Sequence, residues 1–262
     1  MEITVLGCSG AELPGHNAPG FLLDGKILFD AGSLTGILDE KAQWKIRDIF
    51  ITHAHLDHIK SIPFLAGNIV FKRHKHTVCV YSIPAIINVL SKNLLNDAMW
   101  PDFSRIPNPE TSVISLVKMP LDKPLEKHGY IITPIKVTHT VPATGFLVEK
   151  IMSAAGDGSK KTFFYTGDTG PTDGTWKKLS KTRLDCLIIE SSFPNKQKEM
   201  AVGTGHLTPQ LLMQEISKLA HMPATIYITH IKPQYQKQTE ADLKALKLNN
   251  LVVLKDGDKF KI

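Results

Sequence analysis

The sequence predicts a layered α/β protein, and three observations lead to this prediction. Short segments rich in Ile and Val recur along the whole chain of 262 residues, as they do in the strands of a sheet. Segments with apolar residues at helical spacing lie between some of them. No repeat, low-complexity stretch or linker divides the chain. We therefore expect a single domain over residues 1–262.

The expected strands are short and are separated by polar or Gly-containing turns. They cover residues 3–6, 20–23, 26–29, 48–51, 78–81, 130–137, 145–148, 162–165, 186–190, 225–229 and 251–254. Asp24 and Gly25 favour a hairpin turn between the second and third of these strands. A further polar connection is expected at residues 156–160.

Four helical segments follow from the spacing of apolar residues. They cover residues 63–66, 84–98, 209–220 and 240–247. Thr208 is a suitable N-cap for the third, and Pro209 suits its first position. Residues 99–128 are rich in proline and fit neither periodicity, so we expect an irregular insertion there.

The composition indicates a globular protein in a reducing compartment. Hydrophobic residues make up 42% and charged residues 21% of the chain, and no apolar run approaches the roughly 18 residues of a membrane span. The chain opens on a strand pattern without the basic and apolar regions of a secretory signal. Cys8, Cys79 and Cys186 are odd in number and widely scattered. We therefore expect no membrane partner and a cytoplasmic location.

The formal net charge of +6 favours an anionic partner. The lysines are dispersed, and the basic stretch with His74 and His76 has only one aromatic neighbour, which is weak support for nucleic-acid binding. We therefore do not expect a nucleic-acid partner, and a charge of this size often reflects only solubility. A homodimer remains open.

Seven potential metal ligands follow predicted strands at the points where loops begin. They are His53, His55, Asp57, His58, His139, Asp168 and His230. Side chains at the ends of neighbouring strands can converge on one crevice. Five imidazoles and two carboxylates without a thiolate suit Zn²⁺, with Mn²⁺ or Fe²⁺ as alternatives.

The spacing of these residues indicates two ions rather than one. In an extended segment His53 and His55 project to the same side, whereas Asp57 and His58 come where the chain turns into a helix. A single ion takes three or four protein ligands, so seven overfill it. Two divalent ions that share Asp168 fit the number of ligands. Such a pair can clamp the oxygens of a phosphoester.

The motif HAHLDH at residues 53–58, followed by His139, Asp168 and His230, resembles the metallo-β-lactamase superfamily. This resemblance implies a four-layer αββα sandwich with a dinuclear site at one edge. Six further segments are similar to the class II cyclic-nucleotide phosphodiesterases: HLDH (55–58), WPDF (100–103), YTGDTGP (165–171), ESSFPN (190–195), GHLTP (205–209) and THIKP (229–233).

The resemblance also implies a role for each ligand and a reaction. One ion would be held by His53, His55 and His139, the other by Asp57, His58 and His230, with Asp168 between them. Asp57 would also accept a hydrogen bond from the attacking water. The reaction would be hydrolysis of cyclic AMP or cyclic GMP to the 5′-monophosphate.

His206 is not needed as a ligand, which leaves it available as a general acid. It lies in a Gly-flanked loop before a helix, and the leaving 3′-oxygen needs a proton. Glu190 ends a predicted strand and could accept a hydrogen bond from the imidazole, keeping it protonated. The alternatives are a helix-capping or packing role for His206 and a structural role for Glu190.

Two other functions stay open. The related tRNA 3′-processing endonucleases carry His-Glu-Ala-Thr where this chain has Ile189 and Glu190, and we find no long Gly/Pro-rich arm for tRNA. A non-catalytic relative of the fold typically lacks several ligands, whereas all seven are present here. Both observations favour the cyclic-nucleotide phosphodiesterase.

Overall fold

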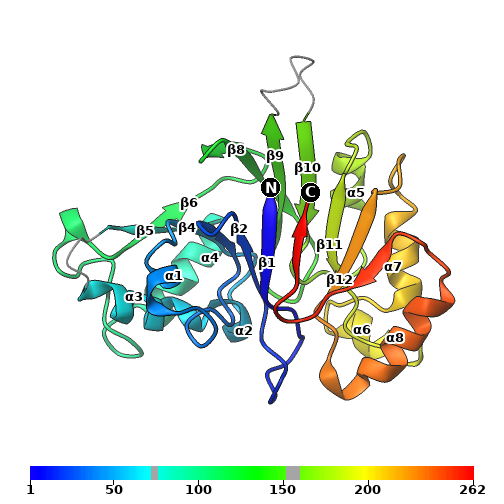
Figure 1. Cartoon of the computed structure of the whole chain (residues 1–262), viewed down its shortest axis with the longest axis horizontal. Helices are drawn as coiled ribbons and strands as arrows, with labels where there is room; N and C mark the ends of the chain where they lie inside the picture. Colours follow the sequence, from blue (N-terminus) through cyan, green and yellow to red (C-terminus); the bar gives the residue numbers. More distant parts are fainter. Residues whose placement is uncertain (72–75, 152–159) are drawn as a thin grey trace.

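The fold consists of two sheets with helices outside each of them (Figure 1). The structure, a computed structural model, describes residues 1–71, 76–151 and 160–262. His74 and most of the connection expected at 156–160 lie outside the described residues. The two ends of the chain lie side by side, because Glu2 in the first strand pairs with Lys261 in the last.

Within the part of the chain that the structure describes, the first sheet has seven strands in the spatial order β14-β1-β2-β3-β4-β5-β6. Their bounds are β1 (Glu2–Gly7), β2 (Gly20–Leu23), β3 (Ile27–Phe29), β4 (Asp48–Phe50), β5 (Val78–Ser82), β6 (Ile114–Lys118) and β14 (Lys259–Lys261). Strands β3 to β6 run parallel, and the others pair antiparallel. The expected hairpin turn joins β2 to β3, with φ of 47° at Asp24 and 69° at Gly25.

The second sheet repeats this plan in the order β13-β12-β11-β10-β9-β8-β7. Its strands are β7 (Leu125–Lys127), β8 (Tyr130–Lys136), β9 (Thr144–Ile151), β10 (Lys160–Tyr165), β11 (Cys186–Glu190), β12 (Thr225–Thr229) and β13 (Leu251–Val253). Strands β10 to β13 run parallel, and β7 to β10 pair antiparallel. Parallel neighbours need a crossover, so their connections supply the outer helices.

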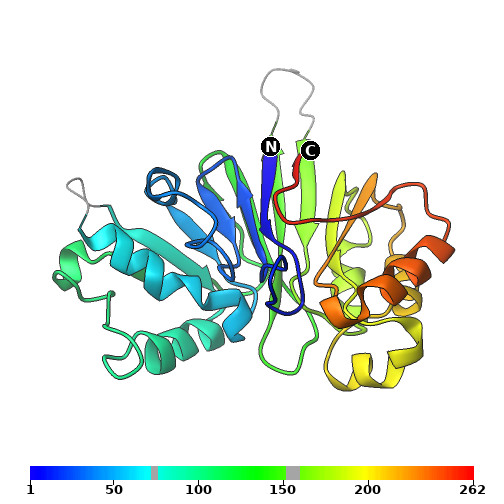
Figure 2. The same ribbon diagram turned by 60° about the horizontal axis from the view of Figure 1, so that its bottom comes forward.

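The helices form the two outer layers (Figure 2). Those of the described residues are α1 (Glu40–Gln43), α2 (Leu56–Ile59), α3 (Ser61–Val70), α4 (Pro84–Val89), α5 (Asp173–Leu179), α6 (Lys198–Gly203), α7 (Pro209–Ile216) and α8 (Gln236–Ala245). Buried side chains of α3 and α4 belong to one core with β4 and β5, and those of α5, α7 and α8 to another with β11 and β12.

A third core fills the space between the sheets and is rich in aromatic residues. The ring of Phe146 on β9 lies 5.8 Å from that of Phe29 on β3 and 5.5 Å from that of Phe50 on β4. Rings of this size bury much apolar area and hold the two sheets face to face. The layers are therefore helix, sheet, sheet and helix, and the αββα prediction is confirmed.

Two expectations about secondary structure are wrong. The helix expected over 84–98 stops being α-helical at Val89, because the next turn, Leu90–Leu94, is π-helical and Leu95 then leaves the helical region. The segment 99–128, expected to be irregular, contains β6 and β7. In β6, Ile114 pairs with Val78 and Leu116 with Val80 of β5, so its apolar alternation outweighs the neighbouring prolines.

Among the described residues, no helix has the length and apolar character needed to cross a membrane. Cys8, Cys79 and Cys186 all carry free thiols.

Candidate metal centre

All seven predicted metal ligands come from loops and from the short helix α2 at one edge of the two sheets. His53 follows β4, His55 is the N-cap of α2, and α2 itself carries Asp57 and His58. The second sheet supplies the others: His139 after β8, Asp168 after β10 and His230 directly after β12. Glu190 is the last residue of β11, and His206 precedes α7.

Unusual backbone conformations bring two of these loops into place. Gly167 has a φ of 60°, and a Cβ there would lie 2.6 Å from the side chain of Thr52, so only glycine lets the Asp168 loop approach β4 this closely. His230 has a φ of 61°, and its N–H donates to the Cys8 carbonyl at 2.6 Å. A left-handed residue other than glycine costs on the order of 1–3 kcal/mol and tends to occur at functional sites.

The first group of ligand atoms has the spacing of a metal site. The Nδ1 atom of His55 lies 3.1 Å from His53 Nε2 and 3.2 Å from His139 Nε2. Asp168 Oδ2 lies 3.7 Å from His53 Nε2. Ligands bound tetrahedrally to zinc at 2.0–2.1 Å are about 3.3 Å apart, so these four side chains match the geometry of one ion.

The second group is formed by Asp57, His58 and His230. The two imidazole Nε2 atoms lie 3.7 and 3.6 Å from Asp57 Oδ2. Asp168 also reaches this group, with Oδ1 3.5 Å from His58 Nε2 and Oδ2 3.3 Å from His230 Nε2. The carboxylate of Asp168 therefore lies between the groups, and each group takes side chains from both sheets.

Two buried nitrogens favour a bound cation here. Among the described residues, His58 Nε2 and His230 Nε2 are buried and have no hydrogen-bond partner. Leaving a buried polar atom without a partner costs about 1–3 kcal/mol, and a coordinated metal would remove this cost. The buried His and Asp residues are therefore consistent with a binuclear metal site.

Asp30, which directly follows β3, orients the imidazole of His58 by direct contact and that of His53 through Thr52. His58 Nδ1–H donates to Asp30 Oδ2 at 2.8 Å, and the Tyr165 hydroxyl donates to the same oxygen at 2.7 Å. The Thr52 hydroxyl donates to Asp30 at 2.9 Å and accepts from His53 Nδ1 at 3.0 Å. Both rings are therefore held through Nδ1 with Nε2 directed at the ligand groups, as is usual for metal-bound histidines.

A similar contact orients His139, whose Nδ1–H donates to the Gly205 carbonyl at 2.9 Å. Gly205 has a φ of 71°, and a Cβ there would lie 2.8 Å from His139 Nδ1. The loop that carries His206 thus also holds a ligand of the first group.

The electrostatics of the second ligand group favour positive charge, whereas burial lowers the pKa values of His53, His55 and His139 in the first. Burial alone lowers the pKa of His58, but the carboxylates of Asp168 and Asp30 outweigh it and raise this pKa well above its usual value. For Asp57 and Asp168, burial alone raises the pKa, but the neighbouring histidines outweigh it and lower both values. Both carboxylates are therefore anionic ligands at neutral pH.

His206 and Glu190 form a buried pair beside these groups. His206 Nδ1–H donates to Glu190 Oε1 at 2.7 Å, and its ring stacks on His230 with centroids 5.3 Å apart. Burial alone lowers the pKa of His206, but the Glu190 carboxylate outweighs it and raises this pKa. Since a ring nitrogen of His206 also lies within 4.8 Å of ligand atoms of Asp168 and His230, this histidine directly adjoins the metal centre.

Three residues that complete the centre were not predicted as site residues: Asp30, Tyr165 and Ser192. Asp30 had the same signal as the predicted ligands, since it is a carboxylate directly after an apolar strand. Tyr165 lies inside a strand, and Ser192 resembles the ordinary polar residues of a loop. Nothing in the local sequence of Tyr165 or Ser192 marks either residue as part of the site.

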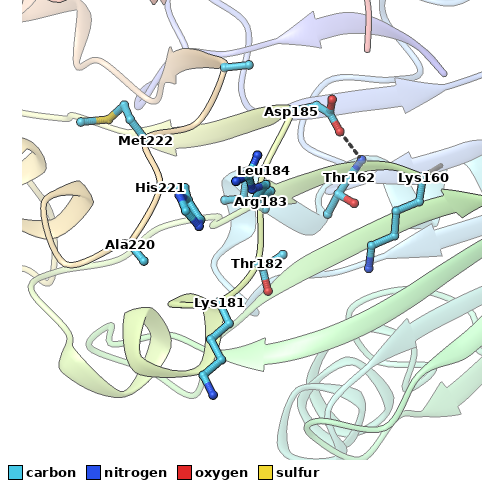
Figure 3. A pocket seen from close by; sticks show the side chains of 11 residues that line it. Lys160, Thr162, Lys181, Thr182, Arg183, Leu184, Asp185, Ala220, His221 and Met222 are labelled. Carbon is cyan, nitrogen blue, oxygen red and sulfur yellow. Dashed lines mark hydrogen bonds between the residues drawn. The ribbon is translucent and has the colours of Figure 1, made fainter.

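A wide pocket elsewhere does not belong to this centre (Figure 3). Lys160 at its edge begins β10, Asp185 precedes β11 and Ala224 precedes β12. The metal-centre residues follow the opposite ends of these strands. The pocket lining contains none of the predicted site residues.

A family model for the beta-lactamase superfamily domain matches residues 26–231, well over half of the chain. The chain belongs to the metallo-β-lactamase superfamily. The matched part contains all seven candidate ligands. It also contains Glu190 and His206.

Curated members of this superfamily match over most of the chain. A probable 3′,5′-cyclic-nucleotide phosphodiesterase of Yersinia pestis is 26% identical over 251 residues, covering 82% of this chain and 68% of the relative. A ribonuclease Z of Methanococcus aeolicus is 25% identical over 289 residues, covering 92% and 87%. The crystal structure of unliganded yeast PDE1 has a TM-score of 0.82 at 19% identity, with 98% of each chain covered. The last likeness concerns the fold alone.

Proposed function

We propose that this protein is a binuclear metal-dependent phosphodiesterase that hydrolyses 3′,5′-cyclic nucleotides to 5′-monophosphates. The observation that carries the proposal is the buried His206–Glu190 pair beside the Asp168 and His230 ligand atoms. A metal centre alone suits many hydrolases of this fold. A proton donor placed beside it suits a reaction whose leaving group is a poor one, such as the 3′-alkoxide of a nucleotide.

Seven side chains would hold the metals, most simply two zinc ions. His53, His55 and His139 would bind one ion and Asp57, His58 and His230 the other, with Asp168 as the shared ligand. When bound, the ions supply Lewis acidity and an activated water. Asp57 has access to solvent, its side chain being 36% exposed, so it can also accept a hydrogen bond from the attacking water.

His206 would deliver the proton to the leaving oxygen. Its Nδ1–H is engaged by Glu190, so the proton that it transfers is the one on Nε2. Glu190 in turn accepts from the backbone N–H groups of Thr169 and Leu207 at 3.0 and 3.2 Å, which fixes its carboxylate. The pair therefore keeps a protonated imidazole oriented beside the reaction centre.

An RNA phosphodiesterase is the second candidate. The ribonuclease Z match, which spans more of both chains than the phosphodiesterase match, favours it, and so does the net charge of +6. Ile189 argues against it, because the tRNA 3′-processing endonucleases have histidine at this position.

A substrate panel separates the two candidates. Metal-loaded protein is offered 3′,5′-cyclic AMP, 3′,5′-cyclic GMP, bis-p-nitrophenyl phosphate and a tRNA precursor with a 3′ extension. We expect turnover of at least one cyclic nucleotide with release of the 5′-monophosphate only. Efficient cleavage of the precursor with no turnover of any cyclic nucleotide would overturn the proposal. An Asp168→Asn variant, which alters a ligand shared by both groups, serves as the background control.

A further inference from the structure

Ser192 lies where the His206–Glu190 pair meets the second ligand group. Its side chain is fully buried. Its Oγ atom lies 2.7 Å from Glu190 Oε2, 2.9 Å from His230 Nδ1 and 3.2 Å from His206 Nδ1. One hydroxyl is thus within reach of a carboxylate and two imidazoles.

The hydroxyl of Ser192 can donate only one hydrogen bond, and Glu190 is the acceptor. Glu190 accepts hydrogen bonds from backbone N–H groups and from His206, so its carboxylate acts as an acceptor towards Ser192 as well. Ser192 must therefore donate to Glu190, at the shortest of its three contacts. Towards His230 the Ser192 oxygen can therefore only accept a hydrogen bond. His230 Nδ1 must then carry the proton and donate it to Ser192 Oγ.

We propose that Ser192 is a positioning residue that links the Glu190 carboxylate to His230 and fixes this ring as the Nδ1–H tautomer. The consequence appears at the other ring nitrogen. His230 Nε2 is left without a proton and faces the carboxylates of Asp57 and Asp168. One carboxylate thus serves both the proton donor and, through Ser192, a metal ligand.

A hydroxyl between a carboxylate and an imidazole also occurs beside the first ligand group. The Thr52 hydroxyl donates to Asp30 and accepts from His53 Nδ1. In both places a hydroxyl between a buried carboxylate and an imidazole determines which ring nitrogen is protonated. The inference rests on the metal site of the proposed function, but not on the substrate.

Ser191 provides a matched control. It is the neighbouring serine and is also fully buried, but among the described residues its Oγ has no hydrogen-bond partner. Ser192→Ala and Ser191→Ala therefore remove the same atom from adjacent buried positions. Only the first removes a contact with His230.

The first measurement is zinc affinity by competition with a chromogenic chelator. We expect Ser192→Ala to weaken binding of one of the two ions 10- to 100-fold, the usual effect of losing a hydrogen-bond partner of a metal-bound histidine. Ser191→Ala should bind both ions as the unchanged protein does, and Ser192→Thr, which keeps the hydroxyl, should recover most of the loss. Equal zinc affinities for the two alanine variants would overturn the inference.

The second measurement needs no variant and decides the matter if Ser192→Ala fails to fold. Nitrogen-15 spectra of histidine-labelled, metal-free protein at mildly alkaline pH report which ring nitrogen of His230 is protonated. We expect the proton on Nδ1, against the usual preference of free imidazole side chains for Nε2. A proton on Nε2 would overturn the inference. Since neither measurement uses a substrate, the inference and the proposed reaction can fail separately.

Discussion

His58 Nδ1 lies 2.8 Å from Asp30 Oδ2, and both side chains are fully buried. Besides His58, Asp30 accepts from the Thr52 N–H, the Thr52 hydroxyl and the Tyr165 hydroxyl. Four donors thus converge on one carboxylate at the end of β3. The metal centre depends on this residue although Asp30 belongs to neither ligand group.

Replacing Asp30 should therefore affect stability as well as metal binding. Asp30→Ala leaves four buried donors without an acceptor, and we expect it to lower the free energy of unfolding of the metal-free protein by about 3–5 kcal/mol. Tyr165→Phe removes only one of the four and should cost about 1 kcal/mol. Urea unfolding measures both values. Similar losses in the two variants would contradict the central role of Asp30.

Removing the metals should abolish turnover and lower thermal stability. The ions are expected to bind the folded chain only, so each site adds about 2.7 kcal/mol when the free ion is present at a hundred times its dissociation constant. We expect chelation to stop phosphodiester hydrolysis and lower the melting temperature, and zinc to restore both. Full activity in protein verified to be metal-free would rule out the proposed chemistry.

His206→Ala should slow substrates according to their leaving groups. A 3′-alkoxide needs a proton, whereas p-nitrophenolate leaves without one. General acid catalysis typically contributes 10²- to 10⁴-fold, and we expect a loss in this range of kcat for a cyclic nucleotide but a small loss for bis-p-nitrophenyl phosphate. Equal losses on the two substrates would assign His206 to metal binding or structure instead.

The pH profile should show the influence of Glu190 on His206. Because the carboxylate raises the pKa of His206, the imidazolium persists to higher pH, and activity that needs it is lost as pH rises through this raised pKa. Glu190→Gln keeps the shape but removes the charge, so the pKa of His206 falls. We expect the alkaline limb of the kcat profile to move to lower pH in this variant. An unchanged limb would separate Glu190 from the protonation of His206.

Gly167→Ala tests the close approach of the Asp168 loop to β4. The left-handed φ and the 2.6 Å clash with Thr52 should cost at least about 1 kcal/mol and displace Asp168, with weaker binding of both ions. Gly174 in α5 is the control, because its Cβ would meet nothing within 4 Å. Gly174→Ala should leave metal binding unchanged and stabilise the helix by up to about 1 kcal/mol. Calorimetry and zinc titration distinguish the two.

The parts of the fold predicted best are those fixed by local sequence. Gly20–Leu23, Cys186–Glu190 and Thr225–Thr229 have the predicted bounds, because uninterrupted apolar runs end there at polar residues. In contrast, the alternation of Lys259–Lys261 around Phe260 is too short to predict a strand by itself, and the segment becomes one by pairing with the edge of β1. The π-helical turn after α4 likewise has no periodicity that a sequence could reveal.

The candidate site, too, could be predicted from the sequence only in part. Ligand candidates such as His53 and His230 could be named because they follow apolar strands, and the structure brings all seven together. The His206–Glu190 pair could also be proposed, from a strand end and a Gly-flanked loop. The contacts behind the ligands could not. Asp30 and Tyr165 are 135 positions apart, and Ser192 reaches His230 only after β11 and β12 have packed side by side. Such contacts follow from tertiary packing, which leaves no local pattern.

Each ligand group draws side chains from both sheets, so a bound ion acts as a crosslink between the two halves of the chain. The first group is incomplete until Asp168 has been synthesised, and the second until His230 has, late in a chain of 262 residues. Capture of an ion by the second group must therefore be one of the last events in the maturation of this protein. Until then its two halves are held together by the aromatic core between the sheets and by hydrogen bonds such as that from Tyr165 to Asp30.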